Sequence, residues 1–206
     1  MTYRSEDESA IASGRATRDM DAMFARMLQW PKTIALLLGA ISALGFAPLS
    51  LKPLTFAAVA LLMALVRTAA DRKAALARGY WFGVGHFVVG LNWLAGAFRY
   101  QDVMPVWFGW VAVVMAALYL AIYPAVTAGI AWRYGRRNGV VFVLWFAGAW
   151  ILTEWLRATL FTGFAWNPLS VVALEPFIMP HGLKLFGAYG ASGLIILFCG
   201  IIAWGI

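Results

Sequence analysis

One run of this sequence, residues 103–132, carries no charged side chain over 30 consecutive positions. A second run, residues 185–206, has 22 uncharged residues. A helix needs about 20 predominantly apolar residues to cross the hydrocarbon core of a bilayer. In lipid, a helix also satisfies its own backbone hydrogen bonds. The two runs therefore predict membrane-spanning helices and exclude a soluble globular fold.

The composition of the chain supports the same fold class. The sequence is 63% hydrophobic and 12% charged, whereas a soluble domain is about half apolar and a quarter charged. The eleven Trp and seven Tyr residues suit the aromatic belts that form at both membrane interfaces. We expect an all-α, polytopic transmembrane helix bundle of about six membrane segments.

Polar connections divide the apolar sequence into six segments. The first two lie within residues 32–67, and each is too short for a full span, so they form either two short helices or one re-entrant hairpin. The 103–132 segment is long enough to tilt, or to kink at Pro124. The other three segments cover residues 79–98, 138–161 and 185–206.

The basic residues lie mainly in alternate connections. Twelve of them fall in the tail and in the 67–78 and 133–137 loops, and the other loops hold four. The positive-inside rule then places both termini in the cytoplasm, with residues 1–32 as a polar tail and residues 33–206 as the transmembrane domain. Because these positions orient membrane helices, the net charge of +7 does not indicate a nucleic-acid partner.

Glu154 and Arg157 lie inside an otherwise apolar run. A charge at the centre of a membrane helix costs about 2.5–3.5 kcal/mol by insertion scales, so it usually has a partner or a function. The i, i+3 spacing places both side chains on one helix face. Two compatible interpretations follow. One is an ion pair that locks this helix to its neighbours. The other is a polar patch near the outer interface that holds a lipid headgroup, since the guanidinium fork suits phosphate.

Other polar residues have weaker signals. Gly79, Gly83 and His86 share one helix face, which predicts a close packing seam with His86 hydrogen-bonded across it. Asn92, on the opposite side, either bonds a neighbouring helix or lines a cavity. Cys199 lies in an apolar run without a nearby base, so we expect a buried, inert thiol. The sequence has no hydrolytic triad, phosphate loop or metal-ligand spacing, and it predicts no metal and no cofactor.

Five short motifs follow one another with a specific spacing. They are Gly45-Phe46-Ala47-Pro48, Gly90-Leu91-Asn92-Trp93, Leu118-Tyr119-Leu120-Ala121-Ile122-Tyr123-Pro124, Thr153-Glu154-Trp155-Leu156-Arg157 and Thr162-Gly163-Phe164-Ala165-Trp166. From about Ile34 to its end, the chain resembles bacterial apolipoprotein N-acyltransferase. It departs from that family's pattern at Ala165, where proline is usual.

The resemblance implies a multi-pass enzyme of the bacterial inner membrane. Such an enzyme transfers an acyl chain from phospholipid to the N-terminal diacylglyceryl-cysteine of a lipoprotein. The family's Glu-Lys-Cys triad belongs to a nitrilase-like domain that follows the membrane helices. No position here matches the triad, and Cys199 is not the nucleophile. The resemblance therefore leaves this sequence without a catalytic residue.

We accordingly expect the membrane half of such an enzyme, truncated at Ile206 and inactive alone. Its expected partners are membrane phospholipid, a lipoprotein substrate and a nitrilase-like domain. The alternative is a non-catalytic membrane scaffold or lipid-binding protein derived from the same fold. The residues expected to contact lipid or substrate are Glu154, Arg157, Trp166, Asn92, Trp93 and Tyr123.

Overall fold

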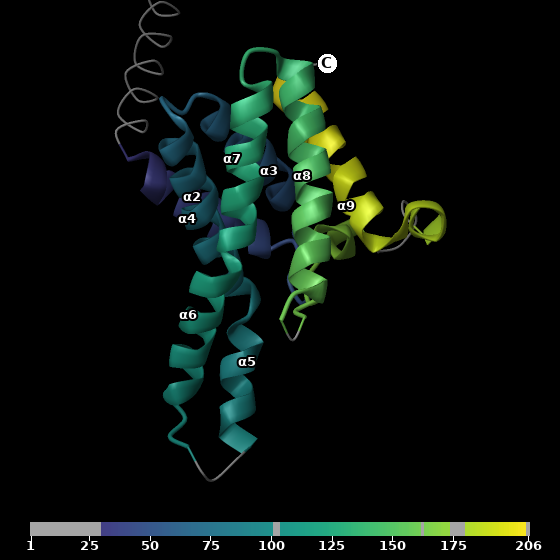
Figure 1. Cartoon of the computed structure of the whole chain (residues 1–206). Coiled ribbons are helices and arrows are strands. Elements are labelled where there is room, and N and C mark those ends of the chain that lie inside the picture. Colours follow the sequence, from purple (N-terminus) through teal and green to yellow (C-terminus); the bar gives the residue numbers. More distant parts are fainter. Residues whose placement is uncertain (1–29, 101–103, 162, 174–179, 205–206) are drawn as a thin grey trace, which may run out of the picture.

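The computed structural model describes residues 30–100, 104–161, 163–173 and 180–204, which are drawn as coloured ribbon in Figure 1. These residues form helices and contain no strand, which confirms the all-α fold. The expected tail lies almost entirely outside the described residues. The helices are α2 (Pro31–Ala43), α3 (Lys52–Arg67), α4 (Arg72–Gly90), α5 (Asn92–Ala97), α6 (Phe108–Leu120), α7 (Ile122–Gly135), α8 (Gly139–Thr159) and α9 (Pro180–Trp204), with short 3₁₀ helices η1 (Phe98–Tyr100) and η2 (Leu169–Ala173).

Several helix starts follow from local sequence. Asp71 accepts a hydrogen bond from the backbone N of Ala74 at 2.7 Å, and it thereby caps α4. Asn138 does the same for α8 through the backbone N of Val141 at 3.1 Å. Both side chains satisfy a backbone donor that the first helical turn leaves open. A proline in the first turn, where no hydrogen-bonding N–H is needed, begins α2 and α3.

Three described helical runs are long and apolar enough to cross a membrane, and a fourth is added if α4 and the following α5–η1 form one span bent by 41°. α2 and α3 have 13 and 16 residues, fewer than the about 20 that a full span requires. The three runs are Phe108–Gly135, Gly139–Thr159 and Leu185–Trp204.

The longest run changes helix at Ala121, between α6 and α7. Pro124 lies in the first turn of α7 and has no N–H to donate to the carbonyl of Leu120, four residues earlier. The helical hydrogen-bond ladder is therefore interrupted here, next to the Pro124 position where a kink was one of the two expectations, although Ala121 keeps helical torsions and Phe108–Gly135 is one run.

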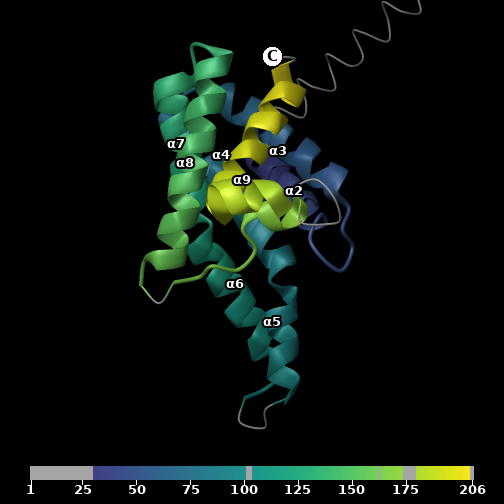
Figure 2. The same cartoon turned by 90° about the vertical axis from the view of Figure 1, so that its right-hand side faces the viewer.

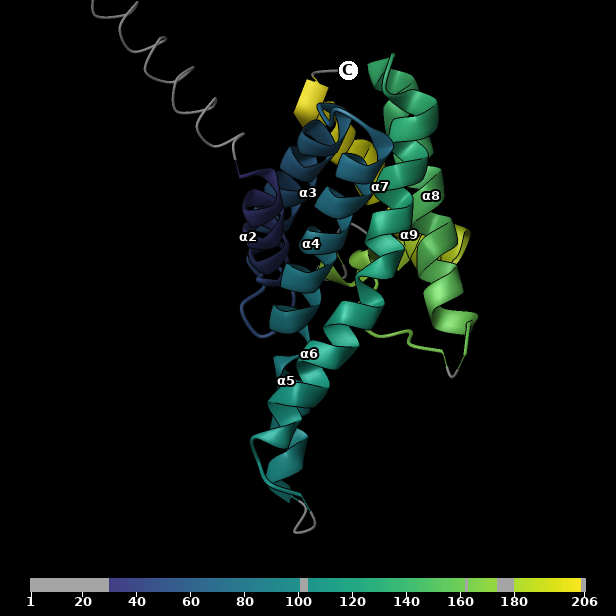
Figure 3. The ribbon, with the colours of Figure 1, turned by 60° about the vertical axis from the view of Figure 1, so that its left-hand side comes forward.

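Six helices form a closed bundle, which we call the body. Each packs against the next in the order α2, α4, α7, α8, α9 and α3, and α3 packs back on α2. Figure 3 shows α2, α3 and α4 on one side of the body and α7 and α8 on the other. Figure 2 shows α9 changing direction across the body. The change occurs at Gly187, whose φ of 67° is readily adopted only by glycine.

Glycines let α4 approach helices on two sides. A Cβ added at Gly85 would lie 2.0 Å from the carbonyl oxygen of Leu36 on α2. On the other side, a Cβ at Gly79 would lie 2.5 Å from the carbonyl oxygen of Pro124 on α7. The predicted seam at Gly79 is therefore confirmed, and a second seam faces α2. Close backbone approach of this kind is a main source of helix association in lipid.

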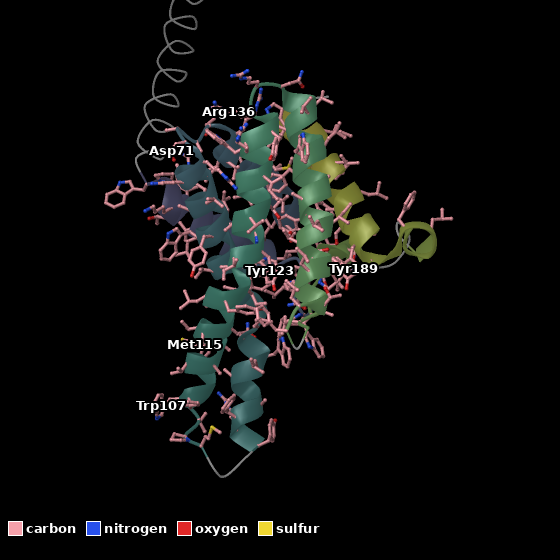
Figure 4. The ribbon with its side chains drawn as sticks, in the orientation of Figure 1. Asp71, Trp107, Met115, Tyr123, Arg136 and Tyr189 are labelled. Atoms are coloured by element: carbon pink, nitrogen blue, oxygen red, sulfur yellow. The ribbon has the colours of Figure 1, made fainter. Side chains whose placement is uncertain are left out.

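The remaining helices form a projection that we call the arm, made of α5, η1 and α6. Figures 1, 2 and 3 all show it extending beyond the ends of α8 and of the other body helices. Figure 4 places Trp107 near the tip of the arm, whereas Asp71 and Arg136 lie at the opposite end of the molecule. The arm and its base share a buried apolar cluster of Phe87, Leu91, Ala95, Val113, Ala117 and Leu120.

Candidate functional site

A cavity lies inside the body, among α2, α3, α4, α7, α8 and the segment that precedes η2. The volume open to the centres of water molecules is about 30 Å³, which is enough for a few waters. Figure 4 shows Tyr123, one of the lining residues, about midway between the two ends of the molecule. The cavity is lined by Ser42, Val59, Phe82, His86, Phe87, Tyr123, Pro124, Trp150, Thr153, Glu154, Arg157, Asn167 and Leu169.

Glu154 is 6% exposed and reaches the cavity from α8. Its Oε1 accepts hydrogen bonds from the indole Nε1 of Trp150 at 3.0 Å and from the backbone N of Leu169 at 2.8 Å. The second bond ties the start of η2 to α8. In the described part of the chain, Oε2 is buried and has no hydrogen-bond partner, so one side of the carboxylate remains open to a small polar ligand or water.

Arg157 lies one turn further along α8 and is 4% exposed. Its Nη2 donates to the carbonyl of Asn167 at 3.4 Å, and the guanidinium lies over the ring of Phe87 at 5.2 Å. Nη1 is buried without a hydrogen-bond partner among the described residues. Arg157 therefore holds the segment after α8, and its Nη1 remains available as a buried hydrogen-bond donor.

Of the two interpretations of Glu154 and Arg157, the ion pair is not found as a direct contact among the described residues. No contact within hydrogen-bonding or ion-pairing distance joins the two side chains in the part of the chain that the structure describes. The helical spacing does bring both to one cavity, but competing partners separate them. The carboxylate turns to the Leu169 backbone, and the guanidinium turns to Phe87 and Asn167.

Asn167 connects this site to α4. Its side-chain Nδ2 donates to the carbonyl of Gly90 at 3.2 Å. Its φ of 52° places it in the left-handed region, which asparagine tolerates better than most residues. The 167–169 segment is thus fixed on one side by Arg157 and Glu154 and on the other by the end of α4.

His86 and Ser42 form a second buried polar pair on the cavity wall. The His86 Nδ1 and Ser42 Oγ lie 2.7 Å apart, and the same hydroxyl lies 2.7 Å from the carbonyl of Gly39. The Ser42 carbonyl accepts from the hydroxyl of Thr55 at 2.7 Å. A hydroxyl that donates to Gly39 accepts from Nδ1–H, which leaves Nε2 as an acceptor. His86 is hydrogen-bonded to another helix as predicted, but its partner lies on α2, so the bond crosses the second seam and not the Gly79 seam, which faces α7.

Comparison with known proteins identifies the family. Residues 38–201 match the family model described as apolipoprotein N-acyltransferase N-terminal domain. The chain belongs to this family. Curated relatives named apolipoprotein N-acyltransferase include a protein of Ralstonia nicotianae, 37% identical over 178 residues, which covers 85% of this chain and 34% of the relative.

Two further relatives of the same name agree. The protein of Rhodopseudomonas palustris is 32% identical over 168 residues, covering 79% of this chain and 31% of its own length. The protein of Rickettsia bellii is 34% identical over 169 residues, covering 81% of this chain and 33% of its own length. The chain therefore spans about a third of the length of the curated relatives it matches.

Three of the five motifs that carry the resemblance meet around the cavity of this N-terminal domain. Tyr123 and Pro124 contribute from the 118–124 motif, and Glu154 and Arg157 from the 153–157 motif. The 90–93 motif borders the same site through the Gly90 carbonyl, which accepts from Asn167. Motifs far apart in the sequence thus build one polar region in an apolar bundle.

Only half of the predicted site residues come together in the cavity. Glu154, Arg157 and Tyr123 line it. Trp93 and Trp166 contact each other at 5.3 Å between ring centroids, are 48% and 60% exposed, and do not line the cavity. Asn92 is exposed on α5. The role of all six in lipid or substrate binding stays a prediction.

Sequence reasoning missed Ser42, Thr153 and Asn167 as site residues, although the two hydroxyl residues have a signal. Ser42 is the one hydroxyl residue in the apolar stretch 34–43 of α2. Thr153 bonds the hydroxyl of Thr127 at 2.8 Å across α7 and α8. Polar side chains in apolar helices usually find partners across a helix interface, so each lone hydroxyl could have been assigned to the interior. Cys199 is fully buried, as expected.

Proposed function

We propose that the chain acts as the membrane domain of an apolipoprotein N-acyltransferase in the bacterial inner membrane. The complete enzyme would transfer an acyl chain from phospholipid to the N-terminal diacylglyceryl-cysteine of a lipoprotein. The observation that carries the proposal is the family match over residues 38–201. Supporting it, three of the five motifs gather at one buried polar site in a bundle that contains helices of membrane length.

In this proposal the chemistry belongs to a nitrilase-like domain that supplies a Glu-Lys-Cys triad. The helices described here hold the phospholipid and the lipoprotein close to that domain. The thiol of Cys199 is fully buried between apolar helices, and nucleophilic catalysis requires an accessible, activated thiolate. Cys199 is therefore a packing residue in this assignment.

The cavity sets the division of roles among the predicted site residues. About 30 Å³ suits water and is too small for a phospholipid headgroup. Glu154 and Arg157 therefore act by positioning the 167–169 segment, which follows directly on Trp166. The exposed rings of Trp166 and Trp93 lie beside each other, and we assign contact with lipid chains to this pair.

A chimaera tests the proposal. This chain would replace the matching third of the Ralstonia relative, and turnover of phospholipid and a diacylated lipopeptide would be measured. We expect turnover by the chimaera, none by this chain alone, and no change from Cys199→Ala. Turnover by the isolated chain would contradict the assignment. A folded but inactive chimaera would favour the alternative, a non-catalytic membrane scaffold or lipid-binding protein.

We also propose that the end carrying Arg136 faces the cytoplasm and that the tip of the arm faces outward, so that both termini are cytoplasmic. The only cysteine is buried Cys199, so introduced cysteines can be labelled against a low background. Arg137→Cys should react only from the inside and Tyr100→Cys only from the outside. The reverse pattern would refute this orientation.

A further inference from the structure

The end of the body opposite the arm carries a hollow that the proposed function does not use. It is about 260 Å³ in volume and is lined by Arg133, Tyr134, Arg136 and Arg137. Figure 4 shows Arg136 at this end, beside the connection from α7 to α8. Three arginine residues thus line one hollow at the end of the body where α7 is connected to α8.

Two of the three arginines, Arg133 and Arg136, have guanidinium groups that lie over aromatic rings. Arg136 lies over the ring of Trp132 at 4.2 Å, and Arg133 lies over Tyr134 at 5.4 Å. Arg67 donates through Nε to the carbonyl of Arg136 at 3.3 Å. A ring contact uses the face of a guanidinium and leaves its N–H edges open to an anion.

No carboxylate in the described part of the chain neutralises this cluster. The acidic residues described there are Asp71, which caps α4, and Glu154, which is buried in the central cavity. Nor does any described ion pair involve the three arginines. The cluster therefore presents a concentrated positive potential to an anion.

An apolar wall adjoins the cluster. Tyr134 stacks on Trp145 of α8 with 4.8 Å between ring centroids. These rings are 58% and 45% exposed, and Leu144 beside them is 57% exposed. Orientation by the positive-inside rule requires only charge. A hollow edged by a stacked aromatic pair and by outward-facing aliphatic side chains is a more specific arrangement.

We propose that this hollow binds the phosphate headgroup of an anionic phospholipid, with the lipid chains lying against Tyr134 and Trp145. Basic pockets between membrane helices suit such headgroups, and the planar fork of arginine donates two parallel hydrogen bonds to phosphate. The adjoining wall favours a lipid over a free anion because only a lipid fills both parts. This site is separate from the central cavity and does not depend on the acyltransferase assignment.

The test uses the full chain in detergent, with bound lipid counted by native mass spectrometry. Phosphatidylglycerol should bind at least tenfold more tightly than phosphatidylcholine. Each basic residue near a membrane surface contributes roughly a fivefold factor. Arg133→Gln and Arg137→Gln should therefore each weaken phosphatidylglycerol binding about fivefold. Lys73→Gln makes the same charge change at the same end of the molecule but outside the hollow. It should weaken phosphatidylglycerol binding by less than about half of that fivefold factor.

Two further measurements separate the site from general surface charge. Trp145→Leu leaves the charge unchanged and should still weaken phosphatidylglycerol binding. Inorganic phosphate should not compete at millimolar concentration. Equal losses in the three charge variants, full binding by Trp145→Leu, or effective competition by phosphate would each overturn the proposal. Should a glutamine variant fail to fold, Arg133→Lys keeps the charge, loses the fork and should still weaken binding.

Discussion

The body and the arm contain similar apolar helices, yet they are held together differently. Within the body, buried polar groups bond across helices, as His86 does with Ser42 and Thr127 with Thr153. Glycines also bring its backbones into contact, with Gly85 against α2. The arm has fewer such contacts. Gly109 on α6 lies close to the backbone of Ala95 on α5, and the Tyr80 hydroxyl of α4 donates to the carbonyl of Leu118 at 3.2 Å. A small apolar cluster surrounds Val113 and Ala117.

This difference has a physical consequence in a membrane. Lipid is as apolar as a leucine side chain, so helices gain little by leaving lipid for one another. Close packing and interhelical hydrogen bonds decide which helices associate. The body has several contacts of both kinds, and the arm has few. We therefore expect the body to be the more stable part and the arm to open at a lower free energy.

The largest effect is expected where α2 meets α4. Gly85→Ala places a Cβ 2.0 Å from a backbone carbonyl oxygen that no side-chain rotation can move. Overpacking of this kind usually costs about 1–3 kcal/mol, and more where backbone must shift. We expect a loss of about 3 kcal/mol or more, or failure to accumulate, measured by thermal unfolding in detergent.

Gly148 on α8 provides the matched control for Gly85. A Cβ there would meet nothing within 4 Å, so Gly148→Ala should be neutral or slightly stabilising. Similar losses for the two variants would show that α2 and α4 do not approach as closely as described.

Much of this fold could be predicted from sequence because charge and hydropathy reflect the bilayer directly. The uncharged run forms α6 and α7. This run and the basic loops could be recognised in the sequence without knowing which other helices pack against them. The break near Pro124 followed from a missing donor. The arm was not predictable, since the bend between α4 and α5 depends on what packs beside Leu91, which is fully buried.

The candidate site was predictable in its members and not in its contacts. Helical spacing correctly placed Glu154 and Arg157 on one side of α8. The helical spacing gave no information on the segment after α8. In that segment the Leu169 N–H binds the Glu154 carboxylate and the Asn167 carbonyl binds the Arg157 guanidinium, so the two side chains have separate partners. Such contacts depend on the geometry of a loop, and a loop has no sequence periodicity from which its contacts could be predicted.

The second largest effect is expected at Glu154. Glu154→Ala leaves two buried donors, the Leu169 N–H and the Trp150 indole, without their acceptor. Each unsatisfied buried group costs about 1–3 kcal/mol. Glu154→Gln keeps the size and one acceptor oxygen, so it should lose clearly less in thermal unfolding. Equal and small losses would mean that the carboxylate does not hold η2.

A double substitution of Glu154 and Arg157 tests whether the two charges are coupled. Glu154 and Arg157 share a cavity without touching, and each single glutamine variant leaves one charge alone in a low-dielectric space. We expect Glu154→Gln with Arg157→Gln to lose less stability than the sum of the single losses. Strict additivity in the same unfolding assay would show that the two charges are independent.

A smaller effect is expected at the joint between α2 and α4. Ser42→Ala removes the hydroxyl that lies 2.7 Å from His86 Nδ1, and a hydrogen bond of this kind contributes about 0.5–1.5 kcal/mol net. The nearby Ser42 carbonyl keeps its bond from Thr55. We expect a loss in that range, with Thr159→Ala at the exposed end of α8 as a control that changes stability less.

The smallest effect compares one substitution in the two regions. Val66 in the body and Val113 in the arm are both fully buried, and Val→Ala removes the two Cγ carbons, for a change of about 1–2 kcal/mol. The loss of stability that is measured depends on how far the neighbouring side chains move in to fill the cavity. The arm is open to lipid on more sides, so Val113→Ala should lower the unfolding temperature less than Val66→Ala. Hydrogen exchange should then rise only within α5 and α6 for Val113→Ala. A larger loss at Val113, or exchange that rises throughout the chain, would show that the arm is as firmly packed as the body.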